Sequence, residues 1–154
     1  MKLSFLLLVL ITFYACDEQI KTVPNAETTA KDQAMTLKGT WEMVGYYNYV
    51  DNKIADSFQT NNGFRQVKMY TDHKVMWSKN VPQDSTEWFG YGDYNHGDNE
   101  LNETLEYGSE MMKKIIDEKK EFTYELQLEK DKFSQIEIDD QGNRIYSENY
   151  KRIE

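Results

Sequence analysis

The sequence predicts an all-β domain in which eight antiparallel strands run up and down and close into a barrel, with one short helix between strands five and six. Two observations lead to this class. From residue 37 onward, short segments of alternating apolar and polar residues are divided by turn-forming residues. Most dividers are short enough for hairpins, and no βαβ pattern intervenes. Closing eight such strands removes their exposed edges most economically, and an open two-sheet sandwich is the alternative.

The expected strands follow one another along the chain with turn residues between them. Aspartate, asparagine, glycine and histidine fill these dividers, and most of them tolerate turn dihedrals. The strands are expected at residues 38–50, 64–71, 74–80, 86–95, 100–107, 121–130, 132–139 and 144–152.

The helix is expected over residues 109–118. Ser109 can cap its amino end, and an apolar stripe at helical spacing follows it, formed by Met111, Met112, Ile115 and Ile116. Such a helix would cover an end or a flank of the barrel.

The first fifteen residues are typical of a cleaved secretory signal. A lysine precedes an apolar run that is too short for a permanent transmembrane helix. The residues before Cys16, the single cysteine, make Phe13-Tyr14-Ala15-Cys16, which resembles the lipobox of bacterial lipoproteins. The resemblance implies a signal peptide at 1–15 and lipid attachment to Cys16. Ordinary secretion with a free thiol is the alternative.

A tether is expected between this signal and the domain. Residues 16–36 have no aromatic side chain and no periodicity, and the folded domain is expected at 37–154. Asp17-Glu18 resembles the acidic signal that directs lipoproteins of Bacteroidetes-type bacteria to the cell surface. We therefore expect a cell-envelope protein that is lipid-anchored to the outer membrane, on its periplasmic face or at the cell surface.

The net charge excludes several partners. The chain has 18 basic and 27 acidic residues, and removal of Lys2 with the signal leaves 17 against 27, a net charge of about −10. Such a surface repels phosphate backbones and anionic headgroups, so nucleic acid is not an expected partner. Membrane contact should come from the lipid anchor only. The oligomeric state is left open.

Motifs at both ends of the domain resemble a known family. Gly39-Thr40-Trp41 matches the Gly-x-Trp signature of lipocalin-like barrels, and Arg152 lies where that family has a late basic residue. The resemblance implies that Arg152 packs over Trp41 and closes the barrel floor beside Gly39. The interior resembles the uncharacterised lipocalin-like domain, a calycin-type barrel, of Bacteroidetes-type exported lipoproteins, on the residues Lys68-Met69-Tyr70-Thr71-Asp72, Trp77, Gly90-Tyr91-Gly92-Asp93-Tyr94 and Asn102-Glu103-Thr104.

Alternation along the strands predicts which side chains face inward. The apolar and aromatic ones are Trp41, Met43, Val67, Met69, Val75, Trp77, Leu101, Leu105, Tyr107, Phe122, Tyr124, Leu126, Leu128, Ile136, Ile138, Tyr146 and Tyr150. Three charged residues share these faces: Glu103, Glu148 and Arg65. A buried charge must be paired, hydrated or neutralised.

These inward charges have two interpretations. In the first, Glu103, Glu148 and Arg65 orient a small apolar or amphipathic ligand among Trp77, Tyr107, Tyr124 and Tyr146. In the second, a glutamate–arginine pair holds the barrel together, or a bulge shifts a face by one residue. The first interpretation predicts non-covalent, non-catalytic binding of a small molecule.

Two other activities remain as alternatives. The aromatic residues Trp88, Phe89, Tyr91 and Tyr94 favour a surface module that binds glycan or protein over a filled core. The simpler interpretation is that these side chains fill the space beside Gly90 and Gly92. An enzyme with Glu103 and Glu148 as an acid–base pair ranks third. His73 and His96 stand alone in turns, and no nucleophile motif is present, so no catalytic residue, metal or cofactor is expected.

Overall fold

A computed structural model of the chain describes residues 35–60 and 63–154. The predicted signal peptide, Cys16 and residues 16–34 of the predicted tether lie outside the described residues. The domain is a compact unit, Ala34–Glu154. Its elements are β1 (Gly39–Val50), β2 (Lys53–Gln59), β3 (Arg65–Tyr70), β4 (Lys74–Asn80), β5 (Trp88–His96), β6 (Glu100–Gly108), α1 (Glu110–Glu118), β7 (Glu121–Leu128), β8 (Lys132–Ile138) and β9 (Arg144–Arg152).

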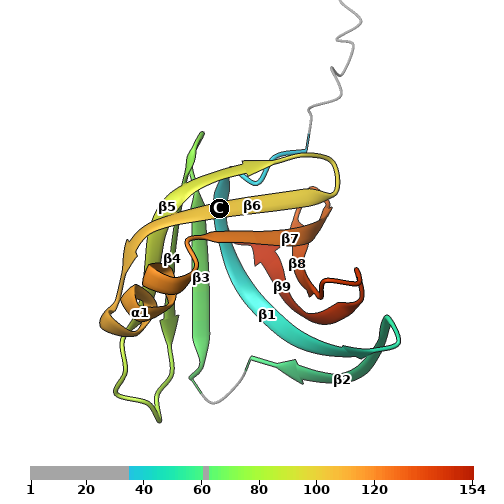
Figure 1. The fold of residues 1–154 in the computed structure, drawn as a ribbon, viewed down its shortest axis with the longest axis horizontal. Coiled ribbons are helices and arrows are strands. Elements are labelled where there is room, and N and C mark those ends of the chain that lie inside the picture. Colours follow the sequence, from blue (N-terminus) through green and yellow to red (C-terminus); the bar gives the residue numbers. More distant parts are fainter. Residues whose placement is uncertain (1–34, 61–62) are drawn as a thin grey trace, which may run out of the picture. The chain divides into compact units, whose positions relative to one another are not determined.

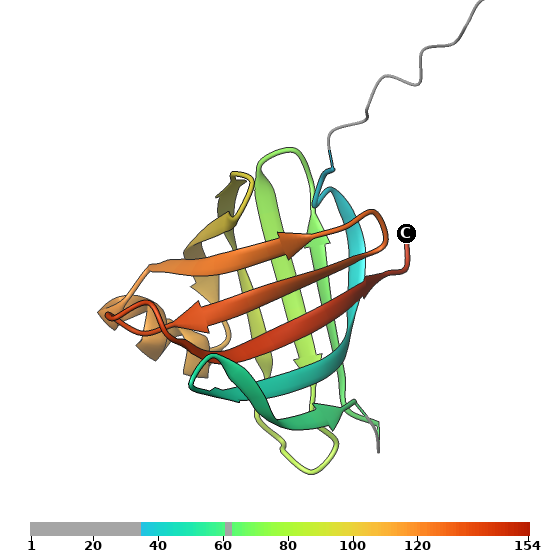
Figure 2. The ribbon, with the colours of Figure 1, turned by 90° about the vertical axis from the view of Figure 1, so that its right-hand side faces the viewer.

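The strands form a single antiparallel sheet that closes on itself. Hydrogen-bonded neighbours run in the order β2-β1-β3-β4-β5-β6-β7-β8-β9, and β1 also pairs with β9. Eight strands therefore form a ring, which Figures 1 and 2 show from two sides. This outcome agrees with the predicted all-β antiparallel class and differs from the open two-sheet alternative.

The ninth strand, β2, was not predicted. It pairs with the second half of β1, from Gly45 to Val50, while β3 pairs with the first part, from Gly39 to Glu42. The hairpin turns at Asp51 and Asn52, which both have positive φ. All seven residues of β2 are exposed, so the sequence has no buried alternation there. Backbone pairing with β1 alone accounts for this strand.

Helix α1 forms where the sequence places it, but its position among the strands needs correction. It follows β6 and precedes β7, and it does not lie between β5 and β6, because β2 adds a strand upstream. Ser109 is the N-cap and accepts a hydrogen bond from the Met112 backbone amide at 3.4 Å. Met112 and Ile116 are buried and pack with Leu105, whereas Met111 and Ile115 are partly exposed.

The main core lies inside the ring around aromatic side chains. Trp41 meets Phe133 edge to face at 4.9 Å between ring centroids, and Phe133 stacks on Tyr150 at 4.6 Å. The buried cluster consists of Leu37, Trp41, Met43, Tyr70, Val75, Leu101, Leu126, Phe133 and Tyr150. Most of these side chains are on faces that the alternation predicted as inward.

Arg152 lies over Trp41 at one end of the ring. Its guanidinium carbon is 3.9 Å from the Trp41 ring centroid, and its nitrogens donate to the carbonyl oxygens of Thr36, Lys38 and Lys130 at 2.6–2.9 Å. A Cβ on Gly39, whose φ is +130°, would come within 2.5 Å of Arg152 Nη1. Glycine at this position therefore leaves room for the guanidinium.

The predicted face of β3 was wrong. Gln66, Lys68 and Tyr70 are buried, whereas Met69 is 46% exposed. Arg65, predicted as an inward ligand-binding residue, lies outside and pairs with Glu42 through Nε, 2.5 Å from Oε1. The cause is that the ring interior accepts polar side chains that bond to one another, so the apolar residues of β3 do not mark its inner face.

Tyr107 also needs correction. It was predicted to face a ligand inside the ring, yet it is 57% exposed. The register between β5 and β6 shifts between Tyr91 and Gly92, which leaves Glu106 as an extra residue. Such a bulge turns the following side chain to the opposite face. Ile138, also predicted inward, is 38% exposed, because Phe133 and Gln135 occupy the inner face of β8 and Ile138 alternates with them.

Candidate functional site

An ion pair occupies the ring interior. Lys68 on β3 donates through Nζ to Glu103 on β6, at 2.9 Å from Oε1 and 3.1 Å from Oε2, and both side chains are 2% exposed. The Tyr70 hydroxyl donates to Glu103 Oε1 at 2.6 Å, and Lys68 Nζ also donates to Gln135 Oε1 at 2.6 Å. Glu103 therefore pairs with Lys68, and not with Arg65. These contacts use the donors of Lys68 and both oxygens of Glu103, which gives the pair a structural role.

Gln135 connects this pair to a second carboxylate. Its Nε2 donates to Glu148 Oε2 at 3.0 Å. The same oxygen accepts from Gln66 Nε2 at 3.1 Å and from the Tyr150 hydroxyl at 2.5 Å. All three donors are neutral, and no ion pair involves Glu148 among residues 35–60 and 63–154.

Two hydrogen-bond acceptors beside this network have no donor in the described part of the chain. Gln66 is 3% exposed, and its buried Oε1 lacks a partner. Its Nε2 is committed to Glu148 and to Tyr150 at 2.7 Å, so the amide orientation is determined by these contacts. Glu148 Oε1 also receives no hydrogen bond there, since all three donors that contact this carboxylate reach Oε2.

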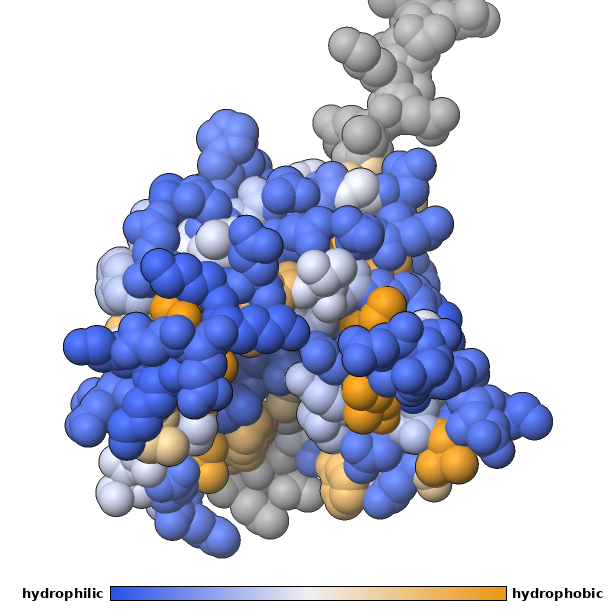
Figure 3. Space-filling view, in the orientation of Figure 1, coloured by the Kyte–Doolittle hydropathy of each residue, from blue (hydrophilic) through white to orange (hydrophobic). Residues whose placement is uncertain are grey.

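Two adjoining cavities meet at Glu148. The inner cavity, of about 90 Å³, lies under the polar network and extends to Met112 of α1, Phe122 and Tyr124. The mouth cavity, of about 410 Å³, lies between β1, β2 and Phe64; its lining residues are Met43, Tyr46, Phe58, Gln59, Thr60, Phe64, Lys79 and Glu148. Lys79 and Glu148 line both. Figure 3 shows the surface hollowed between α1 and the strands on the side of β9.

Tyrosines surround the two cavities. Tyr46 and Tyr146 stack at 5.1 Å between ring centroids. Burial, followed by the charges of Glu103 and Glu148, raises the pKa of Tyr124 well above its usual value. Burial and then the charge of Glu137 raise the pKa of Tyr146. These hydroxyls remain protonated at neutral pH and can donate hydrogen bonds.

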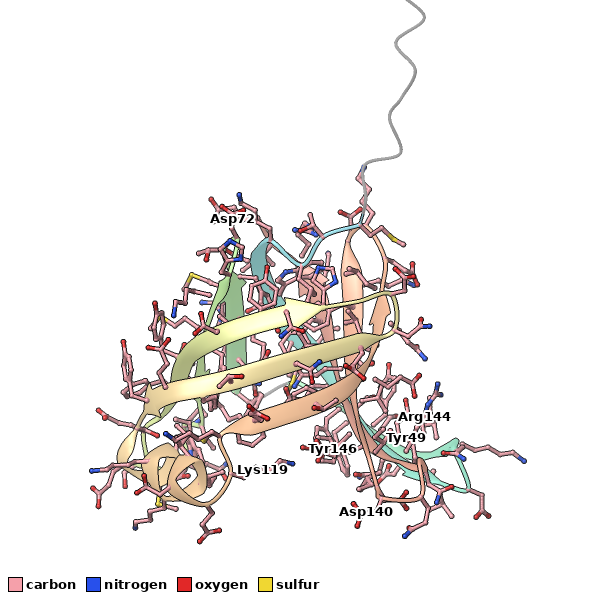
Figure 4. All side chains as sticks on the ribbon, turned by 45° about the horizontal axis from the view of Figure 1, so that its top comes forward. Tyr49, Asp72, Lys119, Asp140, Arg144 and Tyr146 are labelled. Carbon is pink, nitrogen blue, oxygen red and sulfur yellow. The ribbon has the colours of Figure 1, made fainter. Side chains whose placement is uncertain are left out.

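A carboxylate and a lysine face the same region from β8 and α1. Burial raises the pKa of Glu137, and Lys119 at the C-cap of α1 opposes this effect. In Figure 4, Lys119 extends from the helix toward the side of the ring that carries Tyr146. Tyr49 and Arg144 lie together on that side (Figure 4), where the Arg144 guanidinium is 5.8 Å from the Tyr49 ring and is bound to Glu125.

The structure brings five of the seven predicted ligand-binding residues to one place. The inner cavity is lined by Trp77, Glu103, Tyr124, Tyr146 and Glu148. Arg65 and Tyr107 are outside it, for the reasons given above. Gln66, Lys68, Gln135 and the mouth residues other than Met43 and Glu148 were not predicted from the sequence. The spacing of Gln66, Lys68 and Tyr70 at every second position was the available signal, because Tyr70 shows which face is buried.

A larger groove of about 690 Å³ lies over the outer face of β8 and β9. Its rim is charged, with Glu129, Lys130, Asp131, Lys132 and Lys151 among the lining residues. It shares no unpaired buried polar group with the interior network, so we place the candidate site inside the ring despite the smaller volume there.

No group of three or more His, Cys, Asp or Glu side chains in residues 35–60 and 63–154 is arranged to hold a metal ion. No helix of that same part has the length and hydropathy to cross a membrane.

Comparison with known proteins identifies no family for this chain. No protein-family model matches the chain, and no curated protein matches it. A crystal structure of an uncharacterized protein from Bacteroides eggerthii DSM 20697 is similar, with a TM-score of 0.47 and 17% sequence identity over 75% of this chain and 98% of that chain.

Proposed function

We propose that the domain is a lipocalin-like barrel that binds one small amphipathic molecule, without catalysis, in the two cavities that meet at Glu148. The observation that carries this proposal is their combination: an apolar, aromatic mouth leads to a polar interior. Ligand sites generally combine apolar walls with a few fixed polar groups. The mouth volume of about 410 Å³ lies within the range of small-molecule sites, roughly 300–1,000 Å³.

The volumes assign different parts of the ligand to the two cavities. The inner cavity of about 90 Å³ corresponds to about three water molecules at roughly 30 Å³ each. It therefore suits a polar head group rather than a hydrocarbon chain. The apolar part would lie in the mouth against Met43, Phe58 and Phe64.

Binding to the chain from Asp17 to Glu154 tests this function. This chain keeps every described residue and omits the signal and Cys16. An uncharged amphipathic fluorescent dye, N-phenyl-1-naphthylamine, should bind in a saturable manner and be displaced by eight-carbon amphiphiles. Absence of saturable binding and of any thermal shift across a panel of such amphiphiles would contradict the proposal.

Two residues of β2 provide a matched pair for the same assay. Phe58 and Ile54 are 54% and 56% exposed, and only Phe58 lines the mouth cavity. Phe58→Ala should weaken binding roughly tenfold, about 1.4 kcal/mol. Ile54→Ala should leave the affinity unchanged. Equal effects of the two substitutions would place the ligand elsewhere.

For location, we propose that residues 1–15 are a signal peptide, that Cys16 carries lipid and that residues 16–36 tether the domain to the outer membrane. The supporting features are the lipobox-like residues before Cys16 and the acidic pair that follows it. Cells that express the full chain should incorporate labelled palmitate into the protein. Cys16→Ala should abolish this label, and retention of the label would refute the anchor.

One observation favours a second candidate, a surface module. Met69, Met76, Tyr91 and Tyr107 are direct cross-strand neighbours on β3, β4, β5 and β6, and they form an outward row. Tyr91 and Tyr107 lie 5.2 Å apart between ring centroids. If this row binds glycan or protein, Tyr107→Ala should remove binding on a glycan array while dye binding inside the ring is preserved. Dye binding by the unmodified chain without any binding on the glycan array supports the interior site.

A further inference from the structure

We propose that the ligand carries a protonated amine, and that this ammonium group donates to Gln66 Oε1 and Glu148 Oε1 in the inner cavity. The inference rests on the proposed binding function and specifies the chemical class of the head group. It depends on two residues that line one cavity, Gln66 and Glu148, each with one acceptor that has no donor among residues 35–60 and 63–154, and on the charge of Glu148.

Gln66 supplies a buried acceptor in a determined orientation. Its Nε2 donates to both Glu148 Oε2 and Tyr150 Oη, so exchanging the amide oxygen and nitrogen would set an oxygen against a carboxylate. Oε1 is consequently left without a donor in residues 35–60 and 63–154. Buried polar atoms in native proteins nearly always have a partner, and such an exception indicates a position for a ligand or a water molecule.

Glu148 supplies a charged acceptor that the protein leaves without a cation. Its Oε2 is saturated by three neutral donors, which hold the carboxylate in place. Lys68, the nearest lysine in the network, is committed to Glu103 and Gln135. A half-buried carboxylate held in this way is stabilised most by a cation that also donates hydrogen bonds.

The other charged side chains near the cavities determine where a head group other than an ammonium group could bind. Lys79 lines both cavities, and its Nζ lies 5.9 Å from the Phe64 ring and 6.0 Å from the Trp88 ring. An anionic head group would have to bind there. Glu137 adds a further carboxylate near Tyr146, and its influence is visible in the raised pKa of Tyr146. Glu137 lines neither cavity, so besides the Lys68–Glu103 pair the two cavities are lined by one carboxylate, Glu148, and one lysine, Lys79.

Amine, alcohol and carboxylate head groups differ in how many hydrogen bonds they can donate to the two open acceptors. An ammonium group has three donors and a positive charge, so it can satisfy both open acceptors. A hydroxyl has one donor and can satisfy only one of them. A carboxylate has acceptors only, and beside Glu148 it would add repulsion. The cavity should therefore rank the three head groups as amine, alcohol and carboxylate.

Three eight-carbon probes test this ranking on the chain from Asp17 to Glu154 at pH 7. Octylamine, octanol and octanoate share one tail and differ only in the head group. Calorimetric titration should show that octylamine binds at least tenfold tighter than octanol, and that octanoate binds most weakly. Octanoate binding as tightly as octylamine would overturn the inference.

Two substitutions test whether Glu148 and Gln66 cause the preference for octylamine. Glu148→Gln should weaken octylamine at least tenfold and leave octanol within about twofold, so that the preference disappears. Gln66→Met, which keeps the side-chain length and removes the open acceptor, should weaken octylamine severalfold. Glu42→Gln on the outer surface is the control and should change neither probe. A preference for octylamine that survives Glu148→Gln contradicts the assignment.

The outcomes separate this inference from the proposed function. If octanol and the other probes bind without a preference for the amine, the binding function stands and the ammonium site is wrong. If no probe binds, the binding function itself fails and the inference fails with it. Octanol binding also reports whether each variant has kept its fold, and if neither interior variant folds, the ranking in the unmodified chain decides alone.

Discussion

Lys68 and Glu103 meet across the interior of the ring, from strands β3 and β6 that are separated by two others in the sheet. The 2.9 Å contact joins two side chains that are each 2% exposed. Tyr70 and Gln135 supply further hydrogen bonds, so the pair is fully bonded. A buried pair of this kind specifies which faces of β3 and β6 point inward, because neither charge tolerates an apolar environment alone.

Lys68→Met should therefore strongly destabilise the domain. It leaves the Glu103 carboxylate buried without its cation, which costs about 3–5 kcal/mol when one partner of a buried pair is removed. Urea unfolding followed by tryptophan fluorescence measures this loss. The double variant Lys68→Met with Glu103→Leu should recover a large part of it, because no uncompensated charge remains.

The exposed pair of the same strand is the control for that experiment. Arg65 and Glu42 are joined on the outer surface, with side chains 60% and 35% exposed. Arg65→Ala should change the free energy of unfolding by about 0.5 kcal/mol or less, as is usual for surface pairs. A loss equal to that of Lys68→Met would show that Arg65 is not on the outside.

Alkaline pH should destabilise the domain through its interior tyrosines. Burial first, and then the charges of Glu103 and Glu148, raise the pKa values of Tyr70, Tyr124 and Tyr150 well above 10. Above pH 10 the unfolded chain loses these protons while the folded chain keeps them, so the unfolded state binds fewer protons. Stability is therefore fully present below pH 10 and falls as pH rises from there.

Chemical denaturation at pH 8 and pH 11, with phenolate absorbance recorded in parallel, tests whether the free energy of unfolding falls as pH rises. Tyr70→Phe should reduce the loss of stability between the two pH values. Exposed Tyr107→Phe should not affect it. Complete ionisation of all tyrosines in the folded state near pH 10 would contradict the prediction.

Gly92→Ala should disrupt the pairing of β5 with β6. A Cβ at this position would overlap the Thr104 carbonyl oxygen and lie 2.7 Å from the Leu105 Cα, so the backbone of β6 would have to move. Overpacking of this kind costs about 1–3 kcal/mol or more. Gly97→Ala is the matched control, because no atom lies within 4 Å of its added Cβ. Thermal unfolding should separate the two variants, and similar midpoints would argue against the close approach.

Arg152→Ala should open the floor of the ring. The substitution removes the contact with Trp41, about 0.5–2 kcal/mol, and leaves three backbone carbonyl oxygens without their donor. We expect a loss of at least about 2 kcal/mol in urea unfolding, together with a shift of tryptophan emission toward longer wavelength. Lys151→Ala, at an exposed neighbour, should do neither.

Much of the fold follows from local patterns. Alternation places Val75, Trp77, Leu101 and Leu105 inward, and the structure agrees because these strands bury apolar side chains in the ordinary way. The cap at Ser109 and the apolar stripe after it suffice to locate α1. In each case the signal lies within a few residues and needs no distant partner.

The candidate site was predictable only in part. Glu103 and Glu148 stand between apolar inward neighbours, so the alternation finds them. The alternation does not identify Gln66 and Lys68, because a polar residue on a strand is expected to face solvent unless its hydrogen-bond partners are known. Their partners lie on β6, β8 and β9, between 35 and 84 residues away in the chain.

The sequence by itself therefore determined the all-β class, most of the strands, the helix and the two interior glutamates, because residue periodicity reports local burial. Only the tertiary structure decided the pairing of β2, the inner face of β3 and the outward turn of Tyr107. These depend on backbone pairing, a bulge and a polar network whose members gain their favourable energy only when the ring closes and brings them together.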